Sequence, residues 1–223
     1  MGALAAQTWR TVHAERRRLV RDVSGLGGDQ WRVSSLCPGW DIHDVLAHLV
    51  DTARTGRVAF VRDLLMARMD FDLANANGIV RHKRQDPRDT VEALKEAADL
   101  TRTPPARLAT RLVEAIVHGE DIRRPLGIIG WYPEAAIARA LQYQLRTPVS
   151  FGGGRERAAG LRLIDRRTGA AWGHGEDVVA DAIDLLLAVS GRRVDRECLT
   201  GSGASQLAGT ASGTPGAGAA SHR

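Results

Sequence analysis

The sequence predicts a mainly α protein, in which a bundle of four helices is followed by a small α/β domain. Of the 223 residues, 43% are hydrophobic, 26% are charged and only 4% are aromatic, a composition typical of soluble, helix-rich globular proteins. Apolar residues recur with a helical period in the first two thirds of the chain, and they alternate with polar residues further on. We expect a helical domain over residues 3–147, an α/β domain over 148–200 and a disordered tail over 201–223.

Two amphipathic helices are expected at the start of the bundle. The first spans residues 3–24 and ends at the sequence "GLGG". After the turn-rich segment "VSSLCPGWD", Asp41 can cap the N-terminus of a second helix, with Asp44 at the third position of its first turn. We expect this second helix to continue to about Met69.

The other half of the bundle follows a polar segment. Residues 70–87 are interrupted by polar residues and predict a loop, and a third helix is expected over 88–101. A fourth helix is expected to begin near Pro105, since proline is tolerated in a first turn, and to end near Arg124 because Pro125 follows.

The C-terminal third changes its pattern. A short helix over 133–146 precedes the linker-like segment "TPVSFGGGRERAAG". Residues 160–175 alternate around an "RRTG" turn, which predicts a hairpin, and residues 176–193 predict a helix. From Gly201 onward the apolar content is too low to offset chain entropy, so disorder is expected.

Several protein classes are not favoured. No apolar run approaches the roughly 20 residues that span a bilayer, and the N-terminus lacks signal-peptide features, so we expect a cytoplasmic protein without membrane contact. Cys37 and Cys198 lie far apart without C-x-x-C spacing, which indicates neither a thiolate metal site nor a disulfide. The net charge of +5 permits a nucleic-acid partner, but the densest basic cluster, "ERRRLVR", lacks interleaved aromatic residues and a recognition helix.

A chemically informative pattern lies on the fourth helix. At 100° per residue, most of its circumference is apolar, and a narrow polar stripe contains Arg107, Arg111, Glu114, His118 and Asp121. Glu114 and His118 are one helical turn apart, so both side chains can reach a shared ion. The alternative is a solvated helix face.

A third ligand is expected from the second helix. His48 shares its flank with uncharged residues, which suits a groove, whereas His43 lies on the opposite flank. Two imidazoles and one carboxylate form the ligand set of catalytic zinc sites, with one position open for water or substrate. The same set suits non-haem iron(II), so the ligand types leave the metal open.

Two segments resemble a known family. "CPGWDIHDVLAHLV" and "LVEAIVHGEDIRRPLG" are similar to motifs of the mycothiol-dependent maleylpyruvate isomerase family, whose N-terminal domain is a DinB-like four-helix bundle. The resemblance implies a divalent metal, typically zinc, held by His48, Glu114 and His118. Asp121 would either orient His118 or cap the helix end. Residues 161–193 resemble, more loosely, the family's small C-terminal α/β domain.

The resemblance also implies a mechanism. Mycothiol is a low-molecular-weight thiol of actinobacteria, and zinc coordination would lower its thiol pKa. The thiolate would add to a cis double bond, allow rotation and leave again, as in an isomerase, or stay on the electrophile, as in an S-transferase. Arg81, Arg84 and Arg192 are candidate catalytic residues that would hold substrate carboxylates.

We therefore expect a zinc-dependent, mycothiol-using isomerase or thiol S-transferase that acts on a small, maleylpyruvate-like electrophile. The alternative, from a different class, is a non-catalytic DinB-like metal-binding module that interacts with protein or DNA. The sequence leaves open the substrate, the metal, the residues that contact mycothiol, and the choice between monomer and homodimer.

Overall fold

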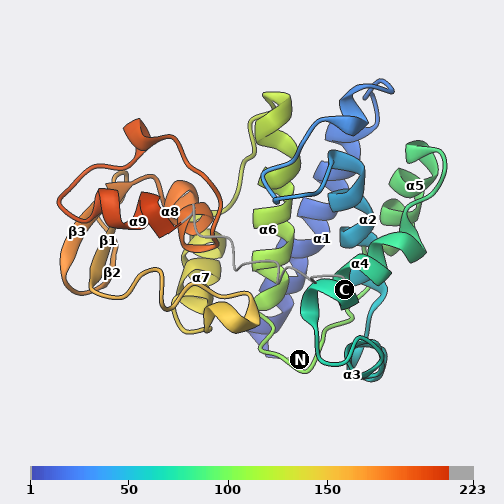
Figure 1. Ribbon diagram of the computed structural model, residues 1–223, viewed down its shortest axis with the longest axis horizontal. Helices are drawn as coiled ribbons and strands as arrows, with labels where there is room; N and C mark the ends of the chain where they lie inside the picture. The colour runs from blue at the N-terminus through green and yellow to red at the C-terminus, as the bar shows by residue number, and fades with distance from the viewer. Residues whose placement is uncertain (1, 211–223) are drawn as a thin grey trace, which may run out of the picture. The chain divides into compact units, whose positions relative to one another are not determined.

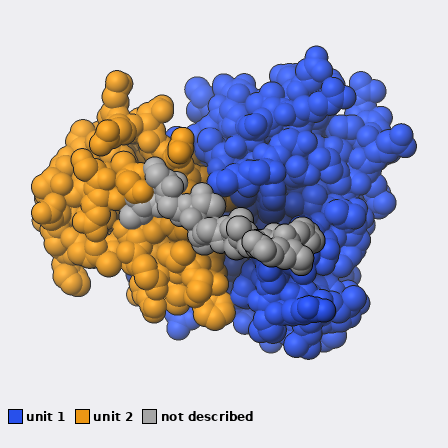
Figure 2. Space-filling model, in the orientation of Figure 1, with its two compact units in different colours: residues 1–143 blue, residues 144–223 orange. Residues whose placement is uncertain are grey.

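The computed structural model describes residues 2–210, and the chain divides into unit 1, residues 1–143, and unit 2, residues 144–223 (Figure 2). Within residues 2–210, no helix combines the length and the apolar character that crossing a bilayer requires.

Unit 1 is built on four helices that pack pairwise (Figure 1). Both α1 and α2 contact α5, and both contact α6, which closes the bundle, while α4 packs on α2. The bundle helices are α1 (Ala3–Val23), α2 (Ile42–Arg54), α5 (Pro87–Ala97) and α6 (Thr110–Arg123). This architecture confirms the mainly α fold that the sequence predicts.

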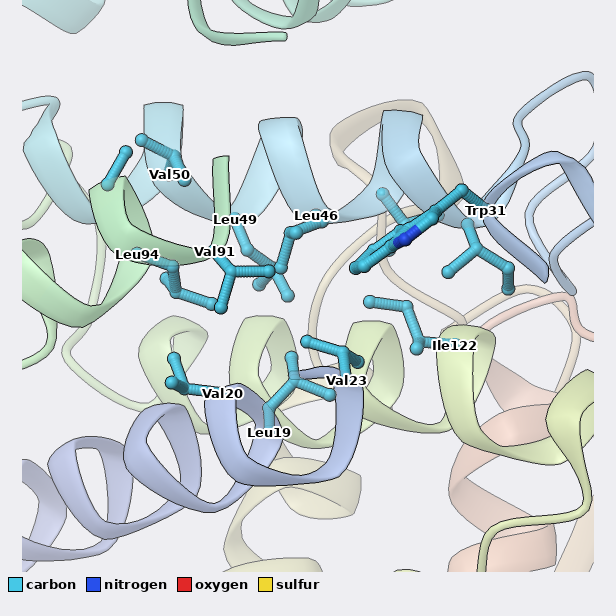
Figure 3. Packing of buried hydrophobic residues seen from close by; sticks show 13 residues of the cluster. Leu19, Val20, Val23, Trp31, Leu46, Leu49, Val50, Val91, Leu94 and Ile122 are labelled. Carbon is cyan, nitrogen blue, oxygen red and sulfur yellow. The ribbon is translucent and has the colours of Figure 1, made fainter. Parts of the chain in front are cut away.

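The bundle core is apolar and closely packed. The core gathers side chains from three helices and one turn (Figure 3). They include Leu19 and Val23 of α1, Leu46 of α2, Ile122 of α6, and Trp31 from the short turn before α2. Each fully buried aliphatic side chain contributes about 1.5–3 kcal/mol. These contacts fix the rotation of α2 and α6 about their own axes, and with it the direction of their polar side chains.

Asp41 caps α2 as predicted. The Asp41 carboxylate accepts a hydrogen bond from the Asp44 backbone N–H at 2.7 Å, and the Asp44 carboxylate accepts one from the Asp41 N–H at 3.0 Å. The Lys83 ammonium donates to both carboxylates. This reciprocal capping box satisfies two free backbone donors and fixes where α2 begins.

The predicted length of α2 was wrong. The helix ends at Arg54, because Thr55 and Gly56 adopt extended backbone conformations, and α3 (Arg57–Met66) begins as a separate helix. The Arg102 guanidinium donates to the carbonyl oxygen of Arg54 at 2.7 Å, so the interrupted helix end keeps a hydrogen-bond partner.

The predicted loop over residues 70–87 was also wrong, because most of it forms α4 (Phe71–His82). Asp70 caps this helix by accepting a hydrogen bond from the Leu73 N–H at 3.0 Å. Gly78 allows α4 to approach α2 closely, since a Cβ atom there would lie 2.6 Å from a carboxylate oxygen of Asp51. The polar character of the segment thus reflects a helix with few buried residues.

The start of α6 differs from the prediction as well. The helix begins at Thr110, and not near Pro105. The Ala106 N–H donates to the Pro104 carbonyl in a tight turn, which uses the two consecutive prolines outside the helix. The predicted short helix near residues 133–146 is confirmed as α7 (Glu134–Gln144), at whose end the two units divide.

Unit 2 contains a three-stranded sheet with the strand order β2-β1-β3. The hairpin of β1 (Leu161–Asp165) and β2 (Ala171–Gly173) is confirmed, and β3 (Glu176–Ala180) pairs parallel to β1. Residues 176–180 were predicted as helix. They form a strand because adjacent valines favour extended backbone and Val178 faces the core; the helix α8 is limited to Ala182–Val189.

The predicted disorder from Gly201 is wrong for residues 201–210. Thr200 pairs with Val179 at the sheet, and the short helix α9 (Ala204–Thr210) follows. Leu207 is fully buried, so one apolar side chain anchors a segment that its composition marks as disordered. Residues 211–223 of the predicted tail lie outside the described residues.

Candidate metal centre

Three side chains converge between α2 and α6. His48, Glu114 and His118 each offer one ligand atom, and these atoms lie within 4.8 Å of one another. Nε2 of His48 is 3.5 Å from Oε2 of Glu114, and Nε2 of His118 is 4.0 Å from the same oxygen. The structure thus brings together the three residues that the sequence singled out as a ligand set.

Helix packing explains this convergence. On α6, Ile116 is buried in the bundle, and on α2 Leu46 is buried, so the side chains next to these positions lie on the flanks of the helix contact. The exposed fraction of the side chain is 5% for His48, 13% for His118 and 25% for Glu114. The polar stripe of α6 is therefore largely shielded from solvent at Glu114 and His118.

The electrostatics favour a carboxylate at Glu114 beside a neutral imidazole at His118. Burial alone would raise the pKa of Glu114, but His48, Arg111 and His118 outweigh it and hold that pKa well below its usual value. Burial lowers the pKa of His118, although Asp121 works in the opposite direction. Glu114 is thus ionised near neutral pH and His118 is neutral, which are the protonation states of metal ligands.

Two buried atoms of the cluster have no hydrogen-bond partner among residues 2–210. They are Oε2 of Glu114 and Nδ1 of His48. A buried acceptor without a donor costs about 1–3 kcal/mol, and more when it is charged. Because Glu114 Oε2 faces two imidazole nitrogens and accepts no hydrogen bond, the donor set fits a divalent cation.

Asp121 supports His118. Its carboxylate is fully buried, and Oδ2 lies 2.8 Å from Nδ1 of His118. This contact turns Nε2 of His118 toward Glu114. The Asp121 carbonyl also accepts a hydrogen bond from the Leu36 N–H, which ties α6 to the segment before α2. Of the two roles that the sequence left open, the geometry favours orientation of the imidazole.

Trp40 packs against one side of the cluster, and the sequence did not predict this position for its ring. Its ring centroid is 5.1 Å from that of His48 and 6.4 Å from that of His118, with an angle of 27° between the ring planes in the second pair. Gly39, with a φ of 81°, makes the turn that brings the indole there. The sequence signal was the "CPGW" turn directly before the helix that carries His48.

The candidate arginines have other partners. Nη1 of Arg81 lies 3.3 Å from Asp51 and 3.0 Å from Asp63, and the exposed Arg84 donates its backbone N–H to Thr90. Arg192 lies in unit 2, where its guanidinium donates to the carbonyl of Ser190 at 2.8 Å. Their assignment to substrate stays a prediction.

Two other histidines, His43 and His82, are largely buried but lie outside the ligand cluster. Nε2 of His43 lies 2.8 Å from the Thr90 hydroxyl, and this ring packs edge-on against Trp31, away from the cluster. The His82 side chain is 13% exposed, and its Nε2 lies 3.5 Å from a carboxylate oxygen of Asp51. Neither ring joins the set of mutually close ligand atoms.

Comparison with protein-family models gives a match in unit 1. A family model described as the mycothiol maleylpyruvate isomerase N-terminal domain matches residues 12–106. Residues 12–106 are therefore similar to this domain family. The match covers α2 with His48 and ends before α6, so Glu114 and His118 are assigned by geometry.

Two solved structures share the fold. The crystal structure of the mycothiol-dependent maleylpyruvate isomerase has 17% sequence identity and a TM-score of 0.62, over 89% of this chain and 92% of that one. A histidine-to-alanine mutant of the mycothiol-dependent maleylpyruvate isomerase has 16% identity and a TM-score of 0.61 over the same shares. At these identities the likeness shows the fold alone. The search of curated proteins gave no match.

Proposed function

We propose that this protein is a metal-dependent enzyme that uses mycothiol, either an isomerase or a thiol S-transferase, on a small electrophile of the maleylpyruvate kind. The observation that carries the proposal is the convergence of two imidazoles on a buried, unpartnered carboxylate oxygen. The family of residues 12–106 supports the same chemistry.

His48, Glu114 and His118 would hold the metal ion. Two nitrogen ligands and one oxygen ligand suit zinc and also iron(II), and the family resemblance favours zinc, with a fourth position left for a substrate or cosubstrate. When bound, the cation supplies an electrophilic centre that lowers the pKa of a thiol, so that a thiolate is present near neutral pH.

The chain's own groups prepare this site. Asp121 holds the proton on Nδ1 of His118, which leaves the Nε2 lone pair directed at Glu114. Trp40 packs against both imidazole rings and excludes water from that side. Glu114 stays ionised because His48, Arg111 and His118 together lower its pKa. Arg81, Arg84 and Arg192 are proposed to bind substrate carboxylates through bidentate contacts.

The isomerase reaction needs no external oxidant or reductant. The mycothiol sulfur forms a bond to one carbon of the cis double bond, and the electron pair of that bond moves into the conjugated carbonyl. Rotation about the resulting single bond follows. The C–S bond then breaks, the trans double bond forms, and the thiolate is released unchanged. In a transferase, the adduct instead takes up a proton and leaves with the thiol.

The test is a reaction of the metal-loaded full-length protein with maleylpyruvate and mycothiol, followed by quantification of isomer and free thiol. Formation of the trans isomer without loss of thiol identifies an isomerase, and loss of thiol into an adduct identifies a transferase. A Glu114→Gln variant serves as the control and should be inactive. A protein that holds metal, yet neither binds mycothiol nor turns over any model electrophile, would be a non-catalytic module and would contradict the proposal.

A further inference from the structure

Exposed apolar side chains gather on α3 and the first turn of α4. Among residues 2–210, twelve large hydrophobic residues are exposed, and six of them lie between positions 58 and 73. Single exposed apolar residues are ordinary on a protein surface, whereas a contiguous group marks an interaction site. The six residues, which form the α3–α4 surface, are Val58, Val61, Leu65, Met66, Met69 and Leu73.

The spacing on α3 arranges three of these residues in one stripe. Val58, Val61 and Leu65 recur at i, i+3 and i+7, so they lie on the same side of the helix. Leu64 is the one buried residue of α3, and the helix lies at the edge of unit 1 beside α4 (Figure 1). Within the described part of the chain, the stripe therefore has no apolar element covering it.

The corner between α3 and α4 fixes the shape of the surface. Arg68 and Met69 both adopt positive φ angles, 55° and 66°, which residues other than glycine seldom do. The Met69 N–H donates to the Leu64 carbonyl at 2.9 Å, and Ala67 is fully buried, so the turn is held from inside. Met66 and Met69 therefore stay exposed, and a partner would meet a surface that is already formed.

The two ends of the α3–α4 surface carry opposite charges. Arg57 begins α3, and Asp70 and Asp72 begin α4, just beyond the other end of α3. A cation at a helix N-terminus faces the positive end of the helix dipole, so Arg57 is unfavourably placed in a single chain. Arg57 and Asp72 are both exposed, and neither forms an ion pair within residues 2–210.

We propose that the α3–α4 surface binds the same surface of a second copy of this chain, in a two-fold symmetric dimer whose α3 helices run antiparallel. A two-fold interface must be complementary to itself. An apolar stripe between opposite charges meets this requirement, because antiparallel pairing covers both stripes and brings Arg57 of each copy to Asp70 and Asp72 of the other. An anionic lipid surface attracts charge of one sign, which the acidic end disfavours.

The expected dimer is weak. Standard interfaces bury about 800 Å² on each partner and use about 20–30 residues a side, and smaller interfaces belong to transient complexes. Helix α3 has 10 residues, and only the first turn of α4 adds to it. We therefore expect association that depends on protein concentration.

The experiment is sedimentation velocity of the full-length protein from low micromolar to near-millimolar concentration. The wild type should rise in mass from one 24.1 kDa chain towards two. Leu65→Glu places a charge in the apolar contact and should weaken association by at least about tenfold. Ile129→Glu is the matched control, since Ile129 is 95% exposed but lies outside the α3–α4 surface, and it should associate like the wild type.

A charge exchange tests the antiparallel arrangement. Arg57→Glu and Asp72→Arg each place like charges opposite one another, so each alone should weaken the dimer, and the double variant should restore it. All substituted side chains are exposed, so each variant is expected to fold.

A wild type that stays monomeric throughout this range would overturn the proposal, and its binding to vesicles of anionic lipid would then make lipid the occupant. A dimer that Leu65→Glu leaves intact would place the contact elsewhere and would overturn it too. A double variant as weak as the single ones would contradict the antiparallel pairing. Neither metal content nor turnover enters these measurements, so their outcome is independent of the proposed function.

Discussion

Helix α6 carries two buried polar clusters that differ in how their charges are matched. In the ion-pair network formed by Glu15, Asp22, Glu120, Arg123 and Tyr132, contacts are short: Arg123 reaches Glu15 at 2.5 Å and Asp22 at 2.8 Å, and the Tyr132 hydroxyl donates to Glu120 at 2.7 Å. In the ligand cluster the closest polar approach of His48 or His118 to Glu114 is 3.5 Å.

The two clusters show that the partners of a buried polar group indicate its role. Each charged group of the ion-pair network has an opposite charge within 2.8 Å, although Nη2 of Arg123 makes no hydrogen bond. Gly130 leaves room for the network, since a Cβ atom there would lie 2.2 Å from a carboxylate oxygen of Glu120. The ligand cluster keeps a bare carboxylate oxygen between two imidazoles. Matched charges indicate a structural device, and converging unmatched ligand atoms indicate a site for a further group.

Arg123→Ala should have the largest effect and should act on stability. It leaves the buried Glu15 with Arg18 as its remaining cation and the half-buried Asp22 without its Arg123 partner, so the free energy of unfolding is expected to fall by about 3 kcal/mol. Urea denaturation of the metal-free protein measures this loss. A fall below about 1 kcal/mol would show that the network is not the structural half of the comparison.

Glu114→Gln should act mainly on metal affinity. The variant is nearly isosteric but removes a charge that the surrounding groups stabilise, so unfolding of the metal-free protein should be favoured less than in Arg123→Ala, whereas zinc affinity should fall by more than the roughly 10–100-fold typical of a supporting residue. Competition with a chromogenic chelator gives the affinity. If stability fell and zinc affinity did not, the two clusters would have exchanged roles.

Asp121→Asn should weaken zinc binding by about 10–100-fold, because the imidazole of His118 loses the carboxylate that orients it. The same competition assay reports the change. Wild-type affinity in this variant would mean that the 2.8 Å contact does not control the ring.

Mild acid should give the smallest effect. The pKa of His118 in the folded protein lies below its ordinary value of 6.5, so the unfolded chain binds this proton first as pH falls. The contribution of His118 to the free energy of unfolding is therefore complete above about pH 6.5 and is lost as pH falls through the lower folded pKa.

Urea midpoints of metal-free wild type and His118→Gln should converge between about pH 7.5 and 5.5. Parallel curves would contradict the lowered pKa of His118. Glu15, whose pKa is raised by burial, acts in the opposite direction in both proteins and cancels in the difference.

The sequence predicted the fold class and the helix ends that have strong caps, such as Asp41. It missed the break at Thr55 and Gly56 and the helix α4, since weakly polar or interrupted segments carry little periodicity and their helices are stabilised by packing on α2. It also missed β3, where five residues of strand run directly into an apolar helix. Tertiary contacts, and not local pattern, decide such segments.

For the site, the sequence predicted that Glu114 and His118 lie together, because spacing on one helix is fixed by geometry, and the structure adds the expected His48 from α2 to this pair. Metal binding by these residues stays a prediction. The sequence could not place Trp40, whose ring reaches the imidazoles through the turn at Gly39, or reveal that Arg111 is buried. Both features depend on how two helices far apart in sequence meet.

The most direct test of the account is elemental analysis of the purified protein beside His48→Ala, with His43→Ala as the matched control. Both histidines are buried on α2, but His43 faces Thr90 and His48 faces Glu114. We predict about one zinc ion per chain in the wild type and in His43→Ala, and nearly none in His48→Ala. Equal metal content in the His48→Ala variant and the wild type would contradict the three-ligand centre.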